Sequence, residues 1–527
     1  MLSLVSRYYH TLRFLQWTQI KYRLWYKLSP SSTTFQKLKT EILTKDLQLL
    51  ESIPLRVFWL GNDSFDFLNI KHHFENGIDW NCSAYGKLWT YNLNYFEFLD
   101  QPGLSKHEGL GLIHDFINNI NNSKDGLEPF PISLRVIFWI KFLIKHNIDD
   151  KLINESLYEQ LQRLSLRPEY HLLGNHLLEN GFSLLFGGVY FNDENLFAQA
   201  NKILTIQLQE QILADGSHFE LSPMYHQIML YRVLDAINLL SQNSSEAYKE
   251  LLLLFNEKAE IMLGWLQQMM LKSGDLPNLN DSISGVAPEP QALLEYASRL
   301  GIRPKQKILK DCGYRKFETT YYELFADVGS IGPDYIPGHA HSDTFSFVLH
   351  LHQSPFIVDT GISTYEKNQR RTLERSTSSH NTVMINNQEQ SDVWGGFRVG
   401  RRAKVTKLEE SSEKLMAIHN GYNHLGATHQ RSFIVRKDSL VITDTITKEK
   451  NGMAFLHFHP MWKLNLSEIK ILGDFGCIEF EGAESVHLEP YFLARGFNQT
   501  VASTKAVIQF KNLLLTKFTF NENTFSN

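Results

Sequence analysis

The period of the hydrophobic residues changes once along this 527-residue chain, near residues 310–318. Before the change, apolar residues recur at three- and four-residue spacings, as in SLRVIFWIKFLIKH and LLLLFNEKAEIMLGWLQQMM, which predicts amphipathic helices. After it, β-branched and aromatic runs such as TFSFVLHLH and RSFIVRKDSLVITDTI alternate with turn residues, which predicts antiparallel sheets. We therefore expect a helical bundle, solenoid or toroid over residues 1–315 and a β domain over residues 316–527.

The composition is that of a folded protein and argues against some partners. Hydrophobic residues make up 43% of the chain and charged residues 21%, which is typical of globular proteins. The formal charge of -5 lacks the basic excess that binds phosphates, so we expect no nucleic-acid partner. Three widely spaced cysteines, Cys82, Cys312 and Cys477, indicate neither a disulfide framework nor a cysteine metal site.

The first 28 residues are basic and rich in aromatic residues. Charged and polar residues interrupt every apolar run, so the segment does not match a signal peptide, and an amphipathic helix describes it better. Such a helix either packs on the body of the protein or touches a membrane surface. No stretch reaches the ~20 apolar residues of a membrane span. We expect a location in the cytoplasm or at the cytoplasmic face of a membrane, with the periplasm left open.

The stretch GNHLLENG, residues 174–181, is predicted to begin a helix. In a helix, His176 and Glu179 lie three positions apart on one face. Asn175 and His176 then lie near its start with their polar groups available. The alternative is a capped helix whose histidine is satisfied in the core.

The stretch DGSHFELSPMYHQ, residues 215–227, predicts a second helix start. Ser222 reads as the N-cap and Pro223 as the first helical residue, which places Tyr225 in the first turn. The positive end of a helix favours a phenolate, so Tyr225 could act as a general base. An ordinary aromatic contact is the alternative.

The stretch GHAHSD, residues 338–343, places His339 and His341 two positions apart. On an extended chain, residues i and i+2 project from the same face, so both could line one cleft. Asp359 and His380 follow on further segments. Two imidazoles and a carboxylate suit zinc better than magnesium, although the loose spacing alone leaves a metal site open.

Taken in order, these stretches resemble the heparinase II/III-like polysaccharide lyases and the related alginate and oligoalginate lyases. The matching stretches are NHLLEN, DGSHFELSPMYH, GHAHSD, FIVDTG and SSHNTV. The resemblance implies an incomplete α/α toroid, then an antiparallel β-sandwich, with an active cleft between them. It also implies β-elimination from a uronic-acid polysaccharide, and we expect a role in bacterial surface polysaccharide metabolism.

The resemblance implies a role for each matching residue. Asn175 and His176 would neutralise the uronate carboxylate, Tyr225 would be the base or acid, and His339 would be the partner base. Glu179 would orient His176 or bind sugar.

Further roles follow from the same resemblance. Tyr365 lies where some alginate-type relatives have a second functional tyrosine. His341, Asp359 and His380 would hold a mostly structural zinc ion.

Basic and aromatic residues could hold an anionic chain. Arg135 and Arg375 are the arginines we expect to bind substrate, with Arg371 and Arg398 as further candidates, and salt bridges are the alternative for each. Three tryptophans could stack on sugars or pack in the core, namely Trp89, Trp139 and Trp394. No phosphate-binding glycine loop is present, so we expect no organic cofactor.

Two other functions remain open. A glycoside hydrolase on the same toroid would need two acids across the scissile bond, for which Glu179, Glu220 and Asp275 are available. A non-catalytic polysaccharide-binding or assembly protein could retain the same fold. The concentration of Asn, His and Tyr in the motifs favours elimination over both.

Overall fold

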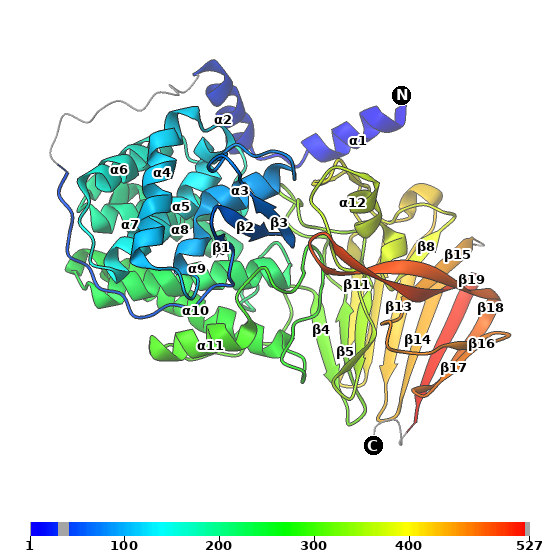
Figure 1. Cartoon of the computed structure of the whole chain (residues 1–527). Helices are drawn as coiled ribbons and strands as arrows, with labels where there is room; N and C mark the ends of the chain where they lie inside the picture. The colour runs from blue at the N-terminus through cyan, green and yellow to red at the C-terminus, as the bar shows by residue number, and fades with distance from the viewer. Residues whose placement is uncertain (1, 30–41, 449, 522–527) are drawn as a thin grey trace.

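The computed structural model describes residues 2–29, 42–448 and 450–521 and consists of a helical half followed by a β half (Figure 1). This arrangement confirms the expected incomplete toroid followed by an antiparallel β-sandwich. The helices of the first half are α1 (Leu2–Leu12), α2 (Trp17–Leu28), α3 (Lys87–Tyr95), α4 (Lys106–Asn119), α5 (Pro129–Lys145), α6 (Lys151–Leu166), α7 (Gly174–Tyr190), α8 (Glu194–Gln211), α9 (Pro223–Gln242), α10 (Lys249–Met269) and α11 (Pro290–Arg299).

Successive helices of the first half pack against each other in pairs. Helix α7 lies against α8, and α9 lies against α10. Helix α5 is buried on nearly all sides, from Pro131 to Leu143, as expected for a helix that is apolar all round. The helical core therefore closes around α5 and α7, and the polar starts of α7 and α9 are free to form a site.

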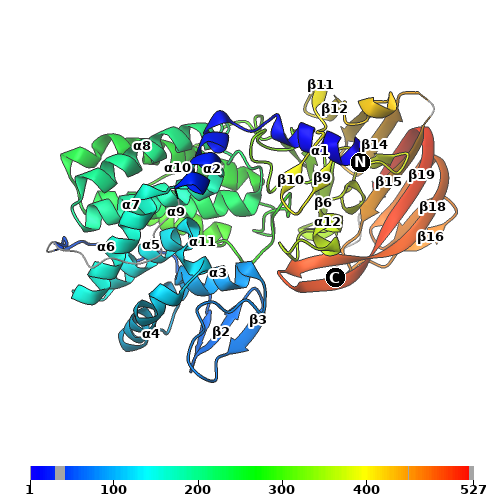
Figure 2. The same cartoon turned by 90° about the horizontal axis from the view of Figure 1, so that it is seen from above.

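A small antiparallel sheet interrupts the helical half and was not expected from the sequence. Its strands are β1 (Trp59–Gly61), β2 (Ser64–Phe67) and β3 (Ile70–His73). Strands of three or four residues are too short to give a periodic signal. The sheet lies beside α3 (Figure 2).

The β half is a sandwich of two sheets. A four-stranded sheet contains β4 (Tyr314–Glu318), β5 (Tyr322–Asp327), β6 (Phe347–Leu351) and β7 (Ser354–Ile357) in that order. The larger sheet contains β11 (Val405–Glu410), β12 (Lys414–His419), β13 (His429–Val435), β14 (Ser439–Ile446), β19 (Gln499–Phe520), β18 (Gly476–Gly496), β17 (Lys470–Gly473) and β16 (Asn465–Ser467), with β15 (Asn451–His457) pairing with β19 and β8 (Val383–Ile385). The two sheets join through aromatic contacts, such as Phe347 with Phe433 at 5.9 Å between ring centroids. Strand β4 begins close to the domain boundary that we place after residue 315.

The two amino-terminal helices lie on different halves of the molecule (Figure 2). Helix α1 contacts β10 (Arg398–Val399), where Trp394 Nε1 donates to Thr11 Oγ1 at 3.2 Å. Helix α2 lies on the helical half, where Tyr22 stacks on Tyr170 with ring centroids 4.7 Å apart. Packing on the body of the protein is thus confirmed for both helices, while membrane contact stays a prediction. Across the described residues, no helix is both long and apolar enough to span a bilayer.

Candidate active site

A cleft of about 340 Å³ brings four of the expected site residues together, and Glu179 is one of them. Asn175 from the start of α7 and Tyr225 from the start of α9 line it from the helical half. Tyr365, from the β half, lines the same cleft. The sequence order of the motifs therefore corresponds to one site assembled from both halves.

The start of α7 is a tightly packed turn. Leu173 and Gly174 both have positive φ angles, of 66° and 59°. A Cβ atom on Gly174 would lie 2.7 Å from Ile336 Cδ1 and 3.0 Å from Glu220 Oε1, so only glycine fits here. Glu220 Oε1 also accepts from the backbone N of Asn175 at 3.3 Å, which fixes where the helix begins.

His176 is held by a carboxylate that the sequence analysis did not single out. Its Nδ1 lies 3.1 Å from Glu169 Oε1. Burial lowers the pKa of His176, but the Glu169 carboxylate more than offsets this and the pKa lies above its ordinary value. The expectation that Glu179 orients His176 is wrong, because both Glu179 oxygens accept from Arg232 Nε at 3.0 Å. Glu179 does line the cleft.

Tyr225 is positioned by its helix cap, as expected. Ser222 Oγ accepts from the Tyr225 backbone N at 3.3 Å, and Pro223 is the first residue of α9. The Tyr225 hydroxyl lies 3.3 Å from that of Tyr365. Burial raises the pKa of Tyr225 above its ordinary value, so the protonated phenol is favoured despite the position of Tyr225 at the helix start.

His339 lies against Tyr225, with ring centroids 3.8 Å apart. Its Nδ1 lies 2.8 Å from Asp281 Oδ2, and its Nε2 lies 3.4 Å from Glu220 Oε2. Residues 338–343 form a turn and a loop, so the expectation of an extended strand there is wrong. His339 and His341 nevertheless converge, because His341 Nε2 contacts Asp281 Oδ1 at 2.8 Å.

Asp281 is the central site residue that sequence reasoning missed. It accepts two hydrogen bonds from Arg371, at 2.5 and 2.6 Å, in addition to its contacts with the two histidines. Burial would raise its pKa, but Arg371 and both histidines hold the pKa well below its usual range. Its neighbour Asn280 has a φ of 54° and donates to Leu221 O at 3.1 Å. The stretch LPNLNDSISG that contains both residues has no motif that would mark them.

The predicted metal ligands come together only in part. The rings of His341 and His380 lie 5.2 Å apart, and each has one buried nitrogen without a hydrogen-bond partner, His341 Nδ1 and His380 Nε2. Asp359 Oδ2 instead contacts His380 Nδ1 at 2.6 Å. Within the described ranges no group of three or more His, Cys, Asp or Glu side chains is arranged to hold a metal ion. His341 Nδ1 and His380 Nε2 are of the ligand type that zinc takes, but they are two where a structural zinc site has four. The Asp359 carboxylate orients the His380 ring.

Two arginines expected to bind substrate do not reach the cleft. Arg135 is fully buried in the helical core and donates to Gln160 Oε1, Asn94 O and Gly126 O. Arg375 is also buried and donates to Ala340 O and Gly396 O. Both expectations are wrong, because these guanidinium groups satisfy backbone carbonyls in the interior. Arg375 instead fixes the loop that carries His339.

The tryptophans that could have stacked on sugars have other surroundings. Trp89 and Trp139 are fully buried. Trp394 is half-buried, and it lies against Tyr8 of α1 and below Arg398. We find no tryptophan among the described residues that line the cleft.

Comparisons with known proteins agree with this architecture. The model of the heparinase II/III N-terminus matches residues 130–309, and that of the heparinase II/III-like C-terminal region matches residues 302–521. The chain belongs to the heparinase II/III-like family.

Relatives of this heparinase II/III-like chain include a heparin-sulfate lyase of Pedobacter heparinus, 25% identical over 333 residues, or 58% of this chain and 48% of the relative. A heparin-sulfate lyase of Bacteroides thetaiotaomicron is 24% identical and covers 55% of this chain and 46% of the relative. The chain spans about half the length of the relatives it matches in these alignments.

Solved structures share the fold over more of the chain. The crystal structure of a heparinase III has a TM-score of 0.69 at 15% identity, covering 96% of this chain and 90% of that one. A heparan sulfate lyase of Pedobacter heparinus has a TM-score of 0.57 at 17% identity, covering 87% and 81% of the two chains. The helical half, the β half and their connection are therefore those of heparinase structures.

Proposed function

We propose that this protein is a polysaccharide lyase that cleaves a uronic-acid-containing polysaccharide by β-elimination. The observation that carries the proposal is the cluster of Tyr225, Tyr365 and His339 beside the start of α7, which bears Asn175 and His176. This cluster joins proton-transfer groups to groups that can bind a carboxylate. Both are required to remove a weakly acidic proton next to an anion.

The elimination removes the C5 proton of the uronate. The C5–H electron pair forms the C4=C5 double bond, the C4–O4 bond breaks, and O4 leaves with a proton from an acid. Asn175 and the cationic form of His176 bind the uronate carboxylate and stabilise the negative charge that develops on it. The Glu169 carboxylate raises the pKa of His176, which favours this cation.

His339 and Tyr225 divide the two proton transfers. Asp281 is ionised and accepts from Nδ1 of His339, which leaves Nε2 with the lone pair that takes the C5 proton. Tyr225, whose pKa is raised, is protonated and gives its proton to O4. Tyr365, 3.3 Å away, then returns a proton to Tyr225 from solvent.

We also propose that His341 and His380 hold a structural zinc ion, with Asp359 positioning His380. Their unpartnered buried nitrogens support this assignment. Bound zinc would fix the loop of His339 against the sheet, and none of the proton transfers above involves it.

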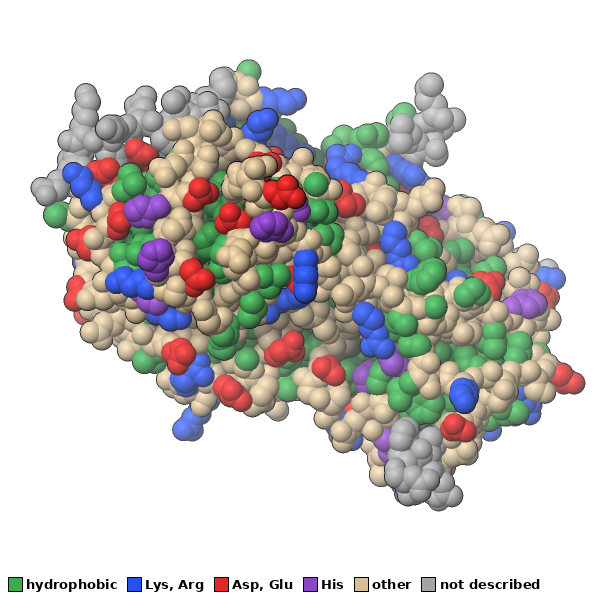
Figure 3. Space-filling view, viewed as in Figure 1, with side chains coloured by type: hydrophobic (Ala, Val, Ile, Leu, Met, Phe, Trp, Pro, Cys, Tyr) green, Lys and Arg blue, Asp and Glu red, His purple; other side chains and the backbone are tan. Residues whose placement is uncertain are grey.

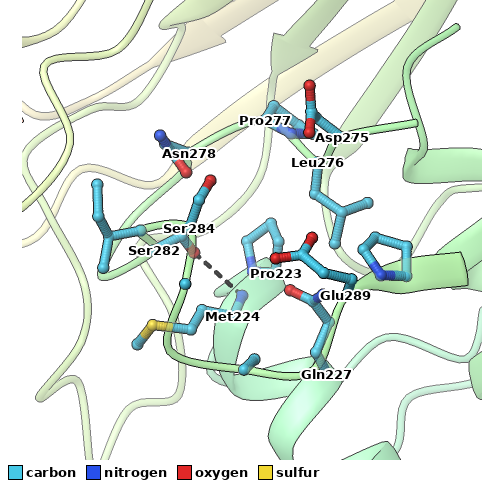
Figure 4. A pocket seen from close by; sticks show the side chains of 14 residues that line it. Pro223, Met224, Gln227, Asp275, Leu276, Pro277, Asn278, Ser282, Ser284 and Glu289 are labelled. Atoms are coloured by element: carbon cyan, nitrogen blue, oxygen red, sulfur yellow. Dashed lines mark hydrogen bonds between the residues drawn. The ribbon is translucent and has the colours of Figure 1, made fainter. Parts of the chain in front are cut away.

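A glycoside hydrolase is the weaker alternative. Glu179 is paired with Arg232, and Glu220 is buried against the backbone of α7. Asp275 lines a separate small pocket with Asn278 and Glu289 (Figure 4). Two of these acids are thus engaged by other groups and the third lines another pocket, which disfavours them as the pair of acids that hydrolysis needs.

The test is ultraviolet absorbance from the conjugated, unsaturated uronate while the protein is offered a panel of uronate polysaccharides. A rise that Tyr225→Phe abolishes is the expected result. New reducing ends without that absorbance would indicate hydrolysis. Binding without either signal would indicate a non-catalytic polysaccharide-binding protein.

We further propose that the protein acts on a bacterial surface polysaccharide at the cytoplasmic face of a membrane. The basic and aromatic side chains of α1 and α2 support this placement. Fractionation of native cells tests it, and recovery chiefly in a periplasmic extract would contradict it.

A further inference from the structure

One wall of the cleft is apolar and partly open to solvent. Its side chains come from the segment before β1, the small sheet, helices α3 and α9, and the loop before α11. The members of this apolar wall are Leu55, Leu68, Leu88, Ile228, Val286 and Ala287. Most are half-buried, and Val286 is 44% exposed. Such a surface gains free energy when it covers apolar groups of a ligand.

The charges that line the cleft offer little to a polyanion. The charged lining residues are two arginines and three glutamates, namely Arg56, Arg232, Glu97, Glu179 and Glu289.

Arg232 is buried and already paired, with Nε at 3.0 Å from Glu179 and Nη2 at 3.7 Å from Glu97. Arg56 is exposed at the rim. Among the described residues that line the cleft, Arg56 is thus the one arginine outside the Glu179 and Glu97 pairs, and no lysine joins it.

The part of the outer surface that Figure 3 shows also lacks a concentration of basic side chains among the described residues. On the face seen in Figure 3, Lys and Arg side chains of the described residues are scattered among Asp and Glu and form no continuous basic field. A sulfated polysaccharide requires such a field or several paired arginines, because each desolvated sulfate without a cation is costly.

Positive charge is favoured where one carboxylate is needed. His176, whose pKa the Glu169 carboxylate raises, lies at the start of α7, next to Asn175. The apolar wall adjoins this point, because Leu68 and Ile228 pack in one apolar cluster with Tyr225. A bound chain therefore meets positive charge at its uronate and apolar side chains at the neighbouring sugars.

We propose that the cleft takes a polymer whose uronate is flanked by unsulfated, uncharged sugars bearing apolar substituents, such as acyl or methyl groups. The apolar wall covers these substituents and the apolar faces of their rings. This substrate class rests on the proposed lyase function and deepens it.

Calorimetry with the full chain carrying Tyr225→Phe tests the proposal without turnover. The probes are an octasaccharide of alternating glucuronate and N-acetylglucosamine and the same octasaccharide with 6-O-sulfates. We expect the unsulfated probe to bind at least tenfold more tightly. Equal or tighter binding of the sulfated probe would overturn the proposal, and so would a lack of binding to both.

A third probe tests the apolar wall at constant charge. Replacing each N-acetyl group by N-formyl removes one methyl group per disaccharide. A buried methyl group contributes a factor of about four in affinity, so we expect a loss of that order or more. Unchanged affinity would show that the wall does not contact the substituents.

These experiments distinguish a failure of the proposed lyase function from a failure of the proposed substrate class. If the wild-type protein binds the unsulfated probe tightly but produces no unsaturated uronate from it, β-elimination of that octasaccharide is excluded. The proposed binding specificity of the cleft then still holds. If the sulfated probe is the better bound and is eliminated, the lyase function stands and the substrate class is wrong.

Two lysine substitutions, one on the apolar wall and one outside the cleft, form a matched pair of variants. Val286→Lys adds a cation at the cleft, whereas Leu253→Lys adds one at a 68% exposed position on α10, outside the cleft. We expect Val286→Lys to improve binding of the sulfated probe relative to the unsulfated probe by about fivefold, and Leu253→Lys to leave the ratio unchanged. Equal ratios in both variants would overturn the proposal.

Discussion

The imidazole of His339 lies on the phenol ring of Tyr225, with their centroids 3.8 Å apart, so that one residue from each half of the molecule forms the centre of the site. Because the rings are in contact, the base and acid we assign can act on the C5 proton and on O4 of the same uronate. Aromatic contact of this kind also holds both rings in one orientation.

Removing the acid should stop elimination and leave the fold intact. For Tyr225→Phe we expect the rate to fall by at least about 100-fold, the usual contribution of general acid–base catalysis, with the ring contact to His339 preserved. Steady-state rates of unsaturated uronate formation measure the loss, and circular dichroism checks the fold. A variant that keeps more than half of the activity would exclude Tyr225 as the acid.

The pH dependence of kcat/KM for elimination should follow the titration of His176. Its pKa is raised by Glu169, so the cation that binds the carboxylate is present at low pH and is lost as the pH rises through this pKa. We expect the alkaline limb of kcat/KM to move to lower pH in Glu169→Gln. If the alkaline limb of kcat/KM does not move in Glu169→Gln, a group other than His176 controls this limb.

Asp281 should be essential for both stability and activity. Asp281→Asn leaves Arg371 buried without its carboxylate, and breaking a buried pair in this way costs about 3–5 kcal/mol. Denaturant unfolding measures this change in the free energy of unfolding. We also expect elimination to be lost, because His339 loses the partner that fixes its tautomer.

A variant of a nearby loop serves as the control for Asp281. Asp275→Asn changes a carboxylate on an exposed loop near the site and should alter the free energy of unfolding by less than about 0.5 kcal/mol. A similar loss in the free energy of unfolding in both variants would show that the loop is responsible, and not the contacts of Asp281 with Arg371 and His339.

Metal analysis should distinguish the role of His341 from that of His339. We expect the purified protein to contain zinc, and His341→Ala or His380→Ala to lose most of it together with thermal stability. His339→Ala should keep the zinc and lose elimination. Full metal content and an unchanged Tm in His341→Ala would contradict this division.

The amino-terminal helices should bind anionic membranes. Trp17 and Trp25 are 73% and 59% exposed, and the basic residues Arg13 and Lys21 are exposed nearby. We expect sedimentation with phosphatidylserine vesicles that weakens with salt and in the double variant Trp17→Ser, Trp25→Ser. Leu253→Ser is the control, and equal binding of both variants would contradict the prediction.

Local sequence signals located the helix starts of the site correctly. Ser222 and Pro223 predict the start of α9, and the structure has the cap in that place. Local signals failed where the partner is distant in sequence. Arg135 and Arg375 were expected to bind substrate, with salt bridges as the alternative, yet both donate to backbone carbonyls, of residues 41 and 35 positions away.

By itself, the sequence determined the change from helices to strands, the cap that places Tyr225 and the order of the motifs, because hydrophobic period and capping depend on residues a few positions apart. Only the tertiary structure decided which side chains meet. Asp281 reaches His339 across 58 positions and Arg371 across 90, and no local pattern encodes such pairs. The site depends on these contacts, because a buried charge must find its partner wherever the fold places one.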